Sequence, residues 1–138
     1  MLPRVREYMN KESQTLTADM TILEAVEFLL DRKLTGAPVV NDANEVVGIL
    51  SEKDCLRLLA EGADNQRPNG VVRDFMTKKV VTVPPTMNIY FVAGMFLNDV
   101  IRRFPVVENG KLVGVISRHD VLRAIQTNLK PPPISPRK

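Results

Sequence analysis

The sequence predicts an α+β protein built from two tandem copies of one small motif. Three observations support this class. The chain aligns with itself at a shift of 67 residues, which becomes 66 after one residue is lost from a turn of the second copy. Within each copy, short apolar runs typical of strands alternate with stretches of helical apolar spacing. Apolar residues make up 44% and charged residues 25% of the 138 residues, as in ordinary globular domains.

The two copies agree at chemically distinctive positions. VREYM at 5–9 lies on VRDFM at 72–76, PVV at 38–40 on PVV at 105–107, and GILSEKD at 48–54 on GVISRHD at 114–120. A unit this small buries only about 60% of its unfolded surface. We therefore expect the copies to pack together with pseudo-twofold symmetry. The predicted organisation is a first motif at 5–61, a connection rich in Gly and Asn at 62–71, a second motif at 72–127, and a proline-rich, basic, disordered tail at 128–138.

Each copy has the predicted order β-α-β-β-α. In the first copy, a short extended piece at 15–16 precedes a helix that begins at the capping box Thr21–Glu24, with Asp19 as another candidate cap. Gly36 and Pro38 are expected to end this helix. Its helical apolar spacing is carried by Ile22, Leu23, Val26, Leu29 and Leu30.

Two strands and a second helix complete the copy. Apolar runs at 37–40 and 46–50 flank a turn at 41–44. Ser51 is expected to cap the second helix, which carries Cys55, Leu56, Leu58 and Leu59. The second copy predicts the same elements at 82–83, 89–101, 104–107, 112–116 and 120–129.

Composition argues against several classes of protein. The longest nearly apolar stretch, Ile89 to Leu97, has nine residues, whereas a membrane span needs about 20. The first residues do not resemble a secretory signal, and the single cysteine suits a reducing, cytoplasmic setting. The net charge of +3 comes from the segment 130–138, and the remainder is balanced at 16 basic and 16 acidic residues. Nucleic-acid binding is therefore disfavoured.

Catalysis and metal binding are not expected. The chain has one His and one Cys, no paired carboxylates in a catalytic pattern and no glycine-rich phosphate loop. A metal site needs three or four ligands, and no His/Cys cluster exists in the sequence.

Two short segments are the candidate binding sites. Ser51 to Asp54 and Ser117 to Asp120 each lie where an apolar strand turns into a helix. Backbone N–H groups at a helix N-terminus favour anions, and a carboxylate can accept hydrogen bonds from a ribose diol. The same serine–aspartate spacing is also an ordinary helix-capping pattern, so both interpretations stay open.

The repeated frame resembles the CBS domain, named after cystathionine β-synthase, over roughly residues 5 to 127. The resemblance rests on the order, spacing and duplication of the segments at 5–9, 38–40, 48–54 and their second-copy equivalents. It implies a tandem pair, often called a Bateman module, which forms disc-like dimers and binds adenosine-containing ligands in clefts between the two motifs. It also implies that the aspartate of each site holds the ribose and that the serine assists near the sugar or phosphate.

The resemblance implies a favoured second site. Arg102 and Arg103 occupy positions where the family often places basic residues that can meet phosphates, although cations at a solvated helix end are the alternative. Phe104 could stack on a purine, but a buried core residue is the commoner outcome. The residues assigned to this site are Val81, Thr82, Val83, Arg102, Arg103, Phe104, Pro105, Ser117, Arg118, His119 and Asp120.

The first site is expected to bind more weakly, because Glu52 would repel a phosphate and Ala37 offers a smaller contact than Phe104. Its assigned residues are Thr15, Leu16, Ala37, Pro38, Ser51, Lys53 and Asp54.

We therefore expect a non-catalytic regulatory sensor of an adenine nucleotide, without an obligatory cofactor. AMP is the simplest ligand; ATP, ADP, NAD and S-adenosylmethionine are alternatives. The expected partners are a second copy, bound through the apolar helices at 22–30 and 89–97, and an unidentified regulated protein. Two other functions stay open: a structural dimerisation module without ligand, and a nucleic-acid-binding regulator acting through Arg102, Arg103, Arg118 and Lys130.

Overall fold

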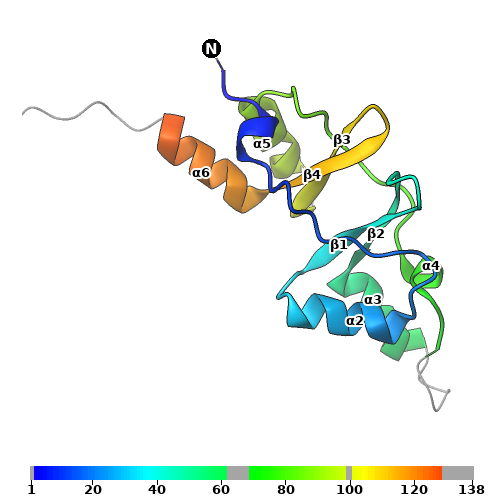
Figure 1. Ribbon diagram of the computed structural model, residues 1–138. Coiled ribbons are helices and arrows are strands. Elements are labelled where there is room, and N and C mark those ends of the chain that lie inside the picture. The colour runs from blue at the N-terminus through cyan, green and yellow to red at the C-terminus, as the bar shows by residue number, and fades with distance from the viewer. Residues whose placement is uncertain (1, 62–68, 99–100, 129–138) are drawn as a thin grey trace, which may run out of the picture. The chain divides into compact units, whose positions relative to one another are not determined.

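The computed structural model describes residues 2–61, 69–98 and 101–128 (Figure 1). Most of the expected connection and nearly all of the tail therefore lie outside the described residues. Helices and strands occur in the same order in both copies, which confirms the α+β class. The elements are α1 (Val5–Tyr8), α2 (Ile22–Asp31), β1 (Gly36–Val40), β2 (Val46–Ser51), α3 (Glu52–Glu61), α4 (Val72–Phe75), α5 (Ile89–Asn98), β3 (Arg103–Glu108), β4 (Lys111–Ser117) and α6 (Arg118–Asn128).

The chain folds into two compact units that do not coincide with the two copies. Of the described residues, unit 1 contains 2–12, 82–98, 101–108 and 113–128, and unit 2 contains 13–61, 69–81 and 109–112. Each copy therefore contributes its short leading helix to the other copy's unit. Helix α1 contacts α6 in unit 1, and α4 contacts α3 in unit 2. The sequence repeat does not reveal this exchange, because it compares copies along the chain and not in space.

A two-stranded sheet forms the centre of each unit. Strands β1 and β2 pair antiparallel, with Gly36 opposite Ser51 and an irregularity between Val39 and Val40. Strands β3 and β4 are neighbours in the other sheet. The residues that connect them, Asn109 and Gly110, both have positive φ, as in the tight two-residue turns that join antiparallel strands.

The extended pieces expected at 15–16 and 82–83 extend these sheets. Leu16 forms a parallel bridge with Val39, and Val83 forms one with Val106. The Leu16 N–H donates to the Pro38 carbonyl over 2.9 Å, and the Val83 N–H donates to the Pro105 carbonyl over 3.0 Å. Each unit therefore gains a short third strand beside β1 or β3.

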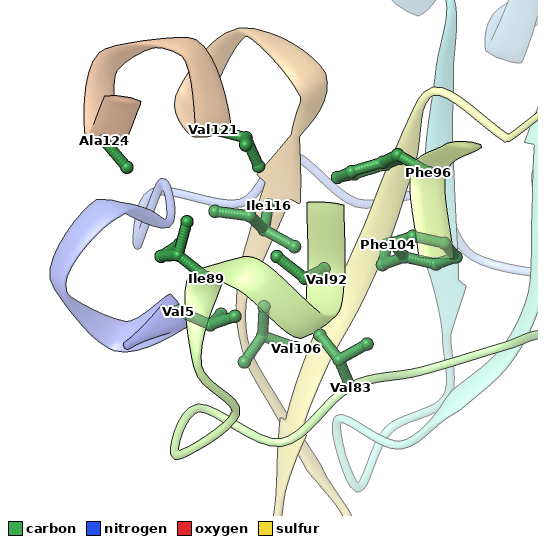
Figure 2. Packing of buried hydrophobic residues seen from close by; sticks show 10 residues of the cluster. All are labelled: Val5, Val83, Ile89, Val92, Phe96, Phe104, Val106, Ile116, Val121 and Ala124. Atoms are coloured by element: carbon green, nitrogen blue, oxygen red, sulfur yellow. The ribbon is translucent and has the colours of Figure 1, made fainter. Parts of the chain in front are cut away.

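The hydrophobic cores of the two units are built from equivalent positions of the repeat. Figure 2 shows the unit 1 core, in which side chains from α1, α5, β3, β4 and α6 meet. Phe96 and Phe104 lie there with their ring centroids 4.6 Å apart. Their equivalents in unit 2 are the smaller Leu29 and Ala37, which are also buried. The unit 2 core consists of Leu16, Ile22, Ala25, Leu29, Ala37, Val39, Leu50 and Val72.

Helix α2 begins where the sequence predicts but ends earlier. The Thr21 hydroxyl accepts from the Glu24 N–H over 3.1 Å, and Glu24 accepts in return from the Thr21 N–H over 3.2 Å, which completes the capping box. Asp19 is not the cap; its carboxylate pairs with Arg73 at 2.6 Å.

The end of α2 was predicted incorrectly. The helix stops at Asp31, and Lys33, not Gly36, adopts the left-handed conformation with φ 54°. The Leu34 N–H donates to the Leu29 carbonyl over 2.9 Å and the Lys33 N–H to the Leu30 carbonyl over 3.2 Å. This is the Schellman arrangement, which usually has glycine at the left-handed position. Because a lysine occupies the left-handed position where a glycine is usual, the residue types alone could not locate the helix end.

A glycine in each sheet lets the exchanged leading segment approach closely. A Cβ atom on Gly114 would lie 2.8 Å from Met9 Sδ, and one on Gly48 would lie 2.6 Å from Met76 Sδ. In unit 1, Asn10 and Val115 exchange two backbone hydrogen bonds of 2.9 and 3.0 Å. In unit 2, the equivalent pair of bonds joins Ile49 and Thr77. These contacts fix the leading helices against the strands that end at the candidate sites.

Within the described ranges, no helix combines the length and the apolar character needed to cross a bilayer.

Candidate ligand site

The Asp120 carboxylate lies at the junction of β4 and α6. Asp120 Oδ2 accepts from the Ser117 N–H over 2.8 Å and from the Ser117 hydroxyl over 2.9 Å. The Asp120 N–H donates to Ser117 Oγ over 3.2 Å. The serine–aspartate pair is therefore a helix cap, the alternative that the sequence left open. Asp120 is only 8% exposed, and a buried carboxylate needs such partners to stay charged.

Two arginines carry positive charge near this carboxylate. Arg123, one helical turn along α6, forms an ion pair with Asp120 Oδ1 at 2.6 Å and also donates to the backbone carbonyl of Tyr8 over 3.1 Å. Arg103, at the start of β3, is half-buried. Burial lowers the pKa of its guanidinium, and the negative charge of Asp120 partly offsets that effect. Unit 1 thus places positive charge around a buried acid.

The other basic residues assigned to the second site are at the surface. Arg102, Arg118 and His119 are exposed. The Arg118 N–H donates to the Arg102 carbonyl over 3.2 Å, so the backbone leading into β3 is tied to the first residue of α6. This bond brings the residues before β3 and the start of α6 to one end of the unit.

The apolar residues assigned to the second site lie mostly in the core. Phe104 is completely buried, so its ring packs on Phe96 and is not available to stack on a base. Val83 and Pro105 are also buried, and only their backbone groups pair at the edge of β3. Thr82 is exposed, whereas Val81, also exposed, belongs to unit 2.

Unit 2 repeats the capped aspartate with different partners. Asp54, 9% exposed, accepts from the Ser51 N–H over 2.9 Å and from the Ser51 hydroxyl over 3.0 Å. The Thr77 hydroxyl donates to Asp54 Oδ1 over 3.2 Å. Arg57, the equivalent of Arg123, lies farther away, at 3.6 Å from Asp54 Oδ1. Apart from its bonds with Ser51, Asp54 is thus held by a neutral hydroxyl and a distant arginine.

The remaining residues of the first site divide into buried and exposed groups. Leu16, Ala37 and Pro38 are buried in the unit 2 core or sheet, Thr15 is half-buried, and Lys53 is exposed. The Glu52 N–H donates to the Thr35 carbonyl over 2.9 Å, which repeats the connection seen between Arg118 and Arg102.

Arg57, Thr77 and Arg123 were not predicted as site residues. Arg57 and Arg123 occupy equivalent positions of the repeat, and each follows its aspartate by three residues. This spacing alone gave no reason to expect that the arginines contact the aspartates. Thr77 lies 23 residues from Asp54, and it reaches that carboxylate only because α4 packs in unit 2.

These groups define what the site can do chemically. A carboxylate held at a helix start accepts hydrogen bonds, and nearby guanidinium groups and helix N–H groups bind anions. In the described part of the chain, no group of three or more His, Cys, Asp or Glu residues is arranged to hold a metal ion. The arrangement suits a polar ligand with hydroxyl donors and an anionic group.

The fold and the site together define a class of protein. It consists of two copies of one α+β motif, and each copy has a capped aspartate where its last strand meets its last helix. The family model described as "CBS domain" matches residues 5–61 and 72–127. The chain therefore belongs to the CBS domain family and carries the motif twice.

Known proteins of this family resemble the chain over most of its length. The crystal structure of CBSX2 in complex with AMP is 30% identical, has a TM-score of 0.82, and is matched over 93% of this chain and 99% of that one. A second structure of CBSX2, from Arabidopsis thaliana, is 28% identical with a TM-score of 0.84, matched over 96% of this chain and all of that one.

Two sequence relatives are much longer than the matched region. MJ1225 of Methanocaldococcus jannaschii is 35% identical over 121 residues, which are 88% of this chain and 42% of MJ1225. The A-adding tRNA nucleotidyltransferase of Aquifex aeolicus is 28% identical over 127 residues, which are 92% of this chain and 15% of that enzyme. The chain thus spans less than half the length of these two relatives.

Proposed function

We propose that this chain is a non-catalytic regulatory module that binds an adenosine-containing ligand, with AMP as the first candidate, at the Asp120 end of unit 1. The observation that carries the proposal is a buried carboxylate at the start of α6 that pairs with Arg123 at 2.6 Å and lies close enough to Arg103 to act on its guanidinium. A ribose diol supplies the hydroxyl donors that such a carboxylate accepts. The phosphate of AMP supplies the anion.

The phosphate is proposed to lie near the basic residues at the same end of the unit. Arg102 and Arg118 are joined through their backbones at 3.2 Å, and both side chains are exposed. Arginine forks suit phosphate oxygens, and the first N–H groups of α6 add a partial positive charge. In unit 2, the first helical residue is Glu52, whose charge opposes a phosphate. We therefore propose that unit 1 binds more tightly.

The comparison with CBSX2 supports AMP as the first ligand to test. CBSX2 has been crystallised with AMP, and it is 30% identical to this chain over nearly its full length. The A-adding tRNA nucleotidyltransferase is matched over only 15% of its own length. These relations support a binding module and not a catalytic one. The single cysteine further supports a cytoplasmic location.

Isothermal calorimetry with AMP tests the proposal. The variants must separate the contribution of Asp120 to ligand binding from its contribution to the helix cap. Replacing Asp120 by alanine would remove the ligand contact together with the carboxylate that accepts from Ser117 in the capping pair, and weakening such a cap costs about 1 kcal/mol. Asp120→Asn keeps an oxygen that can accept from Ser117 but removes the negative charge. Ser117→Ala removes the capping hydroxyl and keeps the carboxylate. Asp54→Asn is the matched change in unit 2.

We expect Asp120→Asn to weaken AMP binding by about tenfold or more, because a hydrogen bond to a charged group contributes about 1.5–3 kcal/mol. Asp54→Asn should leave the tighter binding event unchanged, and Ser117→Ala should lower the stability more than the affinity. Equal affinity of the wild-type and Asp120→Asn proteins, or no AMP binding by the wild type, contradicts the proposed function.

We also propose that the chain forms a homodimer through exposed apolar residues that recur in both copies. Leu97 of α5 is 87% exposed, and its equivalent Leu30 of α2 is exposed as well. In the described part of the chain, Tyr90, Phe91 and Leu97 of α5 face solvent, so this apolar face is available for a second copy to cover. The repeating exposed residues are Leu23 with Tyr90, Leu30 with Leu97, Leu56 with Leu122, and Leu59 with Ile125.

Because the exposed apolar residues recur at equivalent positions of both copies, we infer that they have a shared role and are not randomly scattered. Sedimentation of the wild type and of a Leu30→Glu, Leu97→Glu double variant tests it. We expect a dimer for the wild type and a folded monomer for the variant, with Lys53→Glu as a surface control that stays dimeric. A monomeric wild type at micromolar concentration contradicts this part of the proposal.

A further inference from the structure

Arg123 connects two parts of unit 1 through its guanidinium. It forms the 2.6 Å ion pair with Asp120 and donates over 3.1 Å to the Tyr8 carbonyl, which lies at the last residue of α1. The side chain of Asn128, farther along α6, donates to the Tyr8 hydroxyl over 2.7 Å. Helix α6 therefore holds α1 at two points, and one of them shares its arginine with the candidate ligand site.

The acceptor capacity of Asp120 is nearly filled. A carboxylate offers about four acceptor positions on its two oxygens. Ser117 occupies two of them through its N–H and hydroxyl, both on Oδ2, and Arg123 occupies one on Oδ1. At most one position is left, whereas a ribose diol brings two hydroxyl donors. A ligand that uses both hydroxyls must displace one of the existing partners.

Arg123 is the partner that leaves most easily. The Ser117 N–H is part of the backbone at the turn into α6, and it would be left without its acceptor if Asp120 moved away. The Arg123 side chain is 52% exposed, so water can solvate its guanidinium after release. The Asp120 side chain is only 12% exposed, so the ligand's hydroxyl must replace the guanidinium at that carboxylate when Arg123 leaves. When Arg123 leaves Asp120, it also loses the anchor that holds it against the Tyr8 carbonyl.

We propose that Arg123 competes with the ligand for Asp120 and that its release loosens α1 from α6, so that occupancy of the site is transmitted to the leading helix of the chain. This inference rests on the proposed function. Under this proposal, Arg123 is a positioning residue. It sets the affinity of the site for the ligand and couples the site to α1. The released α1 end, with Tyr8 and the neighbouring Met9, is then the part of unit 1 that changes with ligand.

Unit 2 contains a matched but weaker version of the same connection. Arg57 donates to the Phe75 carbonyl at the end of α4, as Arg123 does to Tyr8. Its distance from Asp54 is 3.6 Å instead of 2.6 Å, and the Thr77 hydroxyl already occupies Asp54 Oδ1. Arg57→Met therefore serves as a control for the loss of one arginine at the equivalent position.

The test combines calorimetry with hydrogen exchange on the full chain. AMP is titrated into the wild type and into Arg123→Met, Arg123→Lys and Arg57→Met variants. Because Arg123→Met removes the competitor, it should bind AMP about two- to fivefold more tightly than the wild type, as expected when a ligand no longer has to displace a half-exposed guanidinium. Arg123→Lys should lie near the wild type, and Arg57→Met should not change the tighter binding event.

Hydrogen exchange of residues 2–10 reports the coupling. In the wild type, saturating AMP should raise exchange in this segment relative to β4. In Arg123→Met, exchange there should already be raised without ligand and should not rise further with AMP. Weaker or equal AMP binding by Arg123→Met, or exchange in 2–10 that does not respond to AMP in the wild type, overturns the inference while the proposed function stands. A wild type that does not bind AMP overturns both.

Discussion

Gly114→Ala should destabilise the protein strongly, because the new methyl group has no space. The added Cβ would lie 2.8 Å from Met9 Sδ and 3.0 Å from the Asn10 carbonyl oxygen, whereas comfortable contacts between such atoms begin near 3.5 Å. Met9 can rotate away, but the Asn10 backbone cannot move without stretching its two hydrogen bonds with Val115, of 2.9 and 3.0 Å. Overpacking of this kind costs about 1–3 kcal/mol, and a weakened hydrogen bond adds to it.

Urea unfolding measures this effect, with Gly94→Ala as the matched control. Gly94 lies in α5, and a Cβ there would meet no atom within 4 Å. The same chemical change should therefore stabilise the protein by about 0.5–1 kcal/mol through helix propensity. We expect Gly114→Ala to lower the free energy of unfolding by about 2–3 kcal/mol. A Gly114→Ala protein as stable as the wild type would refute the close packing of the leading segment against β4.

Three further changes have expected outcomes. Lys33→Gly should raise the free energy of unfolding by about 0.5–1 kcal/mol, because φ is 54° at this position and glycine adopts it without a side-chain penalty; a loss of stability in urea would contradict the helix end described here. Burial, followed by the charges of Asp54 and Glu52, raises the pKa of Cys55, so its alkylation by iodoacetamide at pH 8 should be slower than that of a small-molecule thiol, and an equal rate would disprove this. Hydrogen bonds from Thr21 lower the pKa of Glu24 in the folded chain, so the capping box should stabilise the protein above the ordinary glutamate pKa and lose that effect as the pH falls through the lower folded-state value; Glu24→Gln should remove this part of the acid dependence of thermal unfolding.

The repeat made much of the fold predictable. Equivalent apolar residues recur at the same positions of both copies, so one helical or strand assignment could be checked against the other. The capping box at Thr21 and the serine–aspartate caps at 51–54 and 117–120 are local features, formed by residues three apart. Local hydrogen bonds of this kind depend on few other contacts, and the sequence was sufficient to locate them.

Features that depend on distant contacts were predicted less well. Leu30 fitted the helical spacing, yet it is exposed, whereas Ala25 is buried in its place. A residue's burial depends on which elements cover the helix, and spacing cannot supply that information. The sequence left two roles open for the ring of Phe104, which could stack on a ligand or pack in the core. The ring packs on Phe96, and this contact requires α5 and β3 to meet.

The sequence by itself determined the family, the duplicated β-α-β-β-α order and the two aspartates at helix starts, because these follow from local spacing and from comparison of one copy with the other. Only the tertiary structure decided that the leading helices exchange between units and that Arg123 joins Asp120 to the Tyr8 carbonyl. The physical reason is distance along the chain: 115 residues separate Tyr8 from Arg123, and their contact exists only after α1 has packed beside α6.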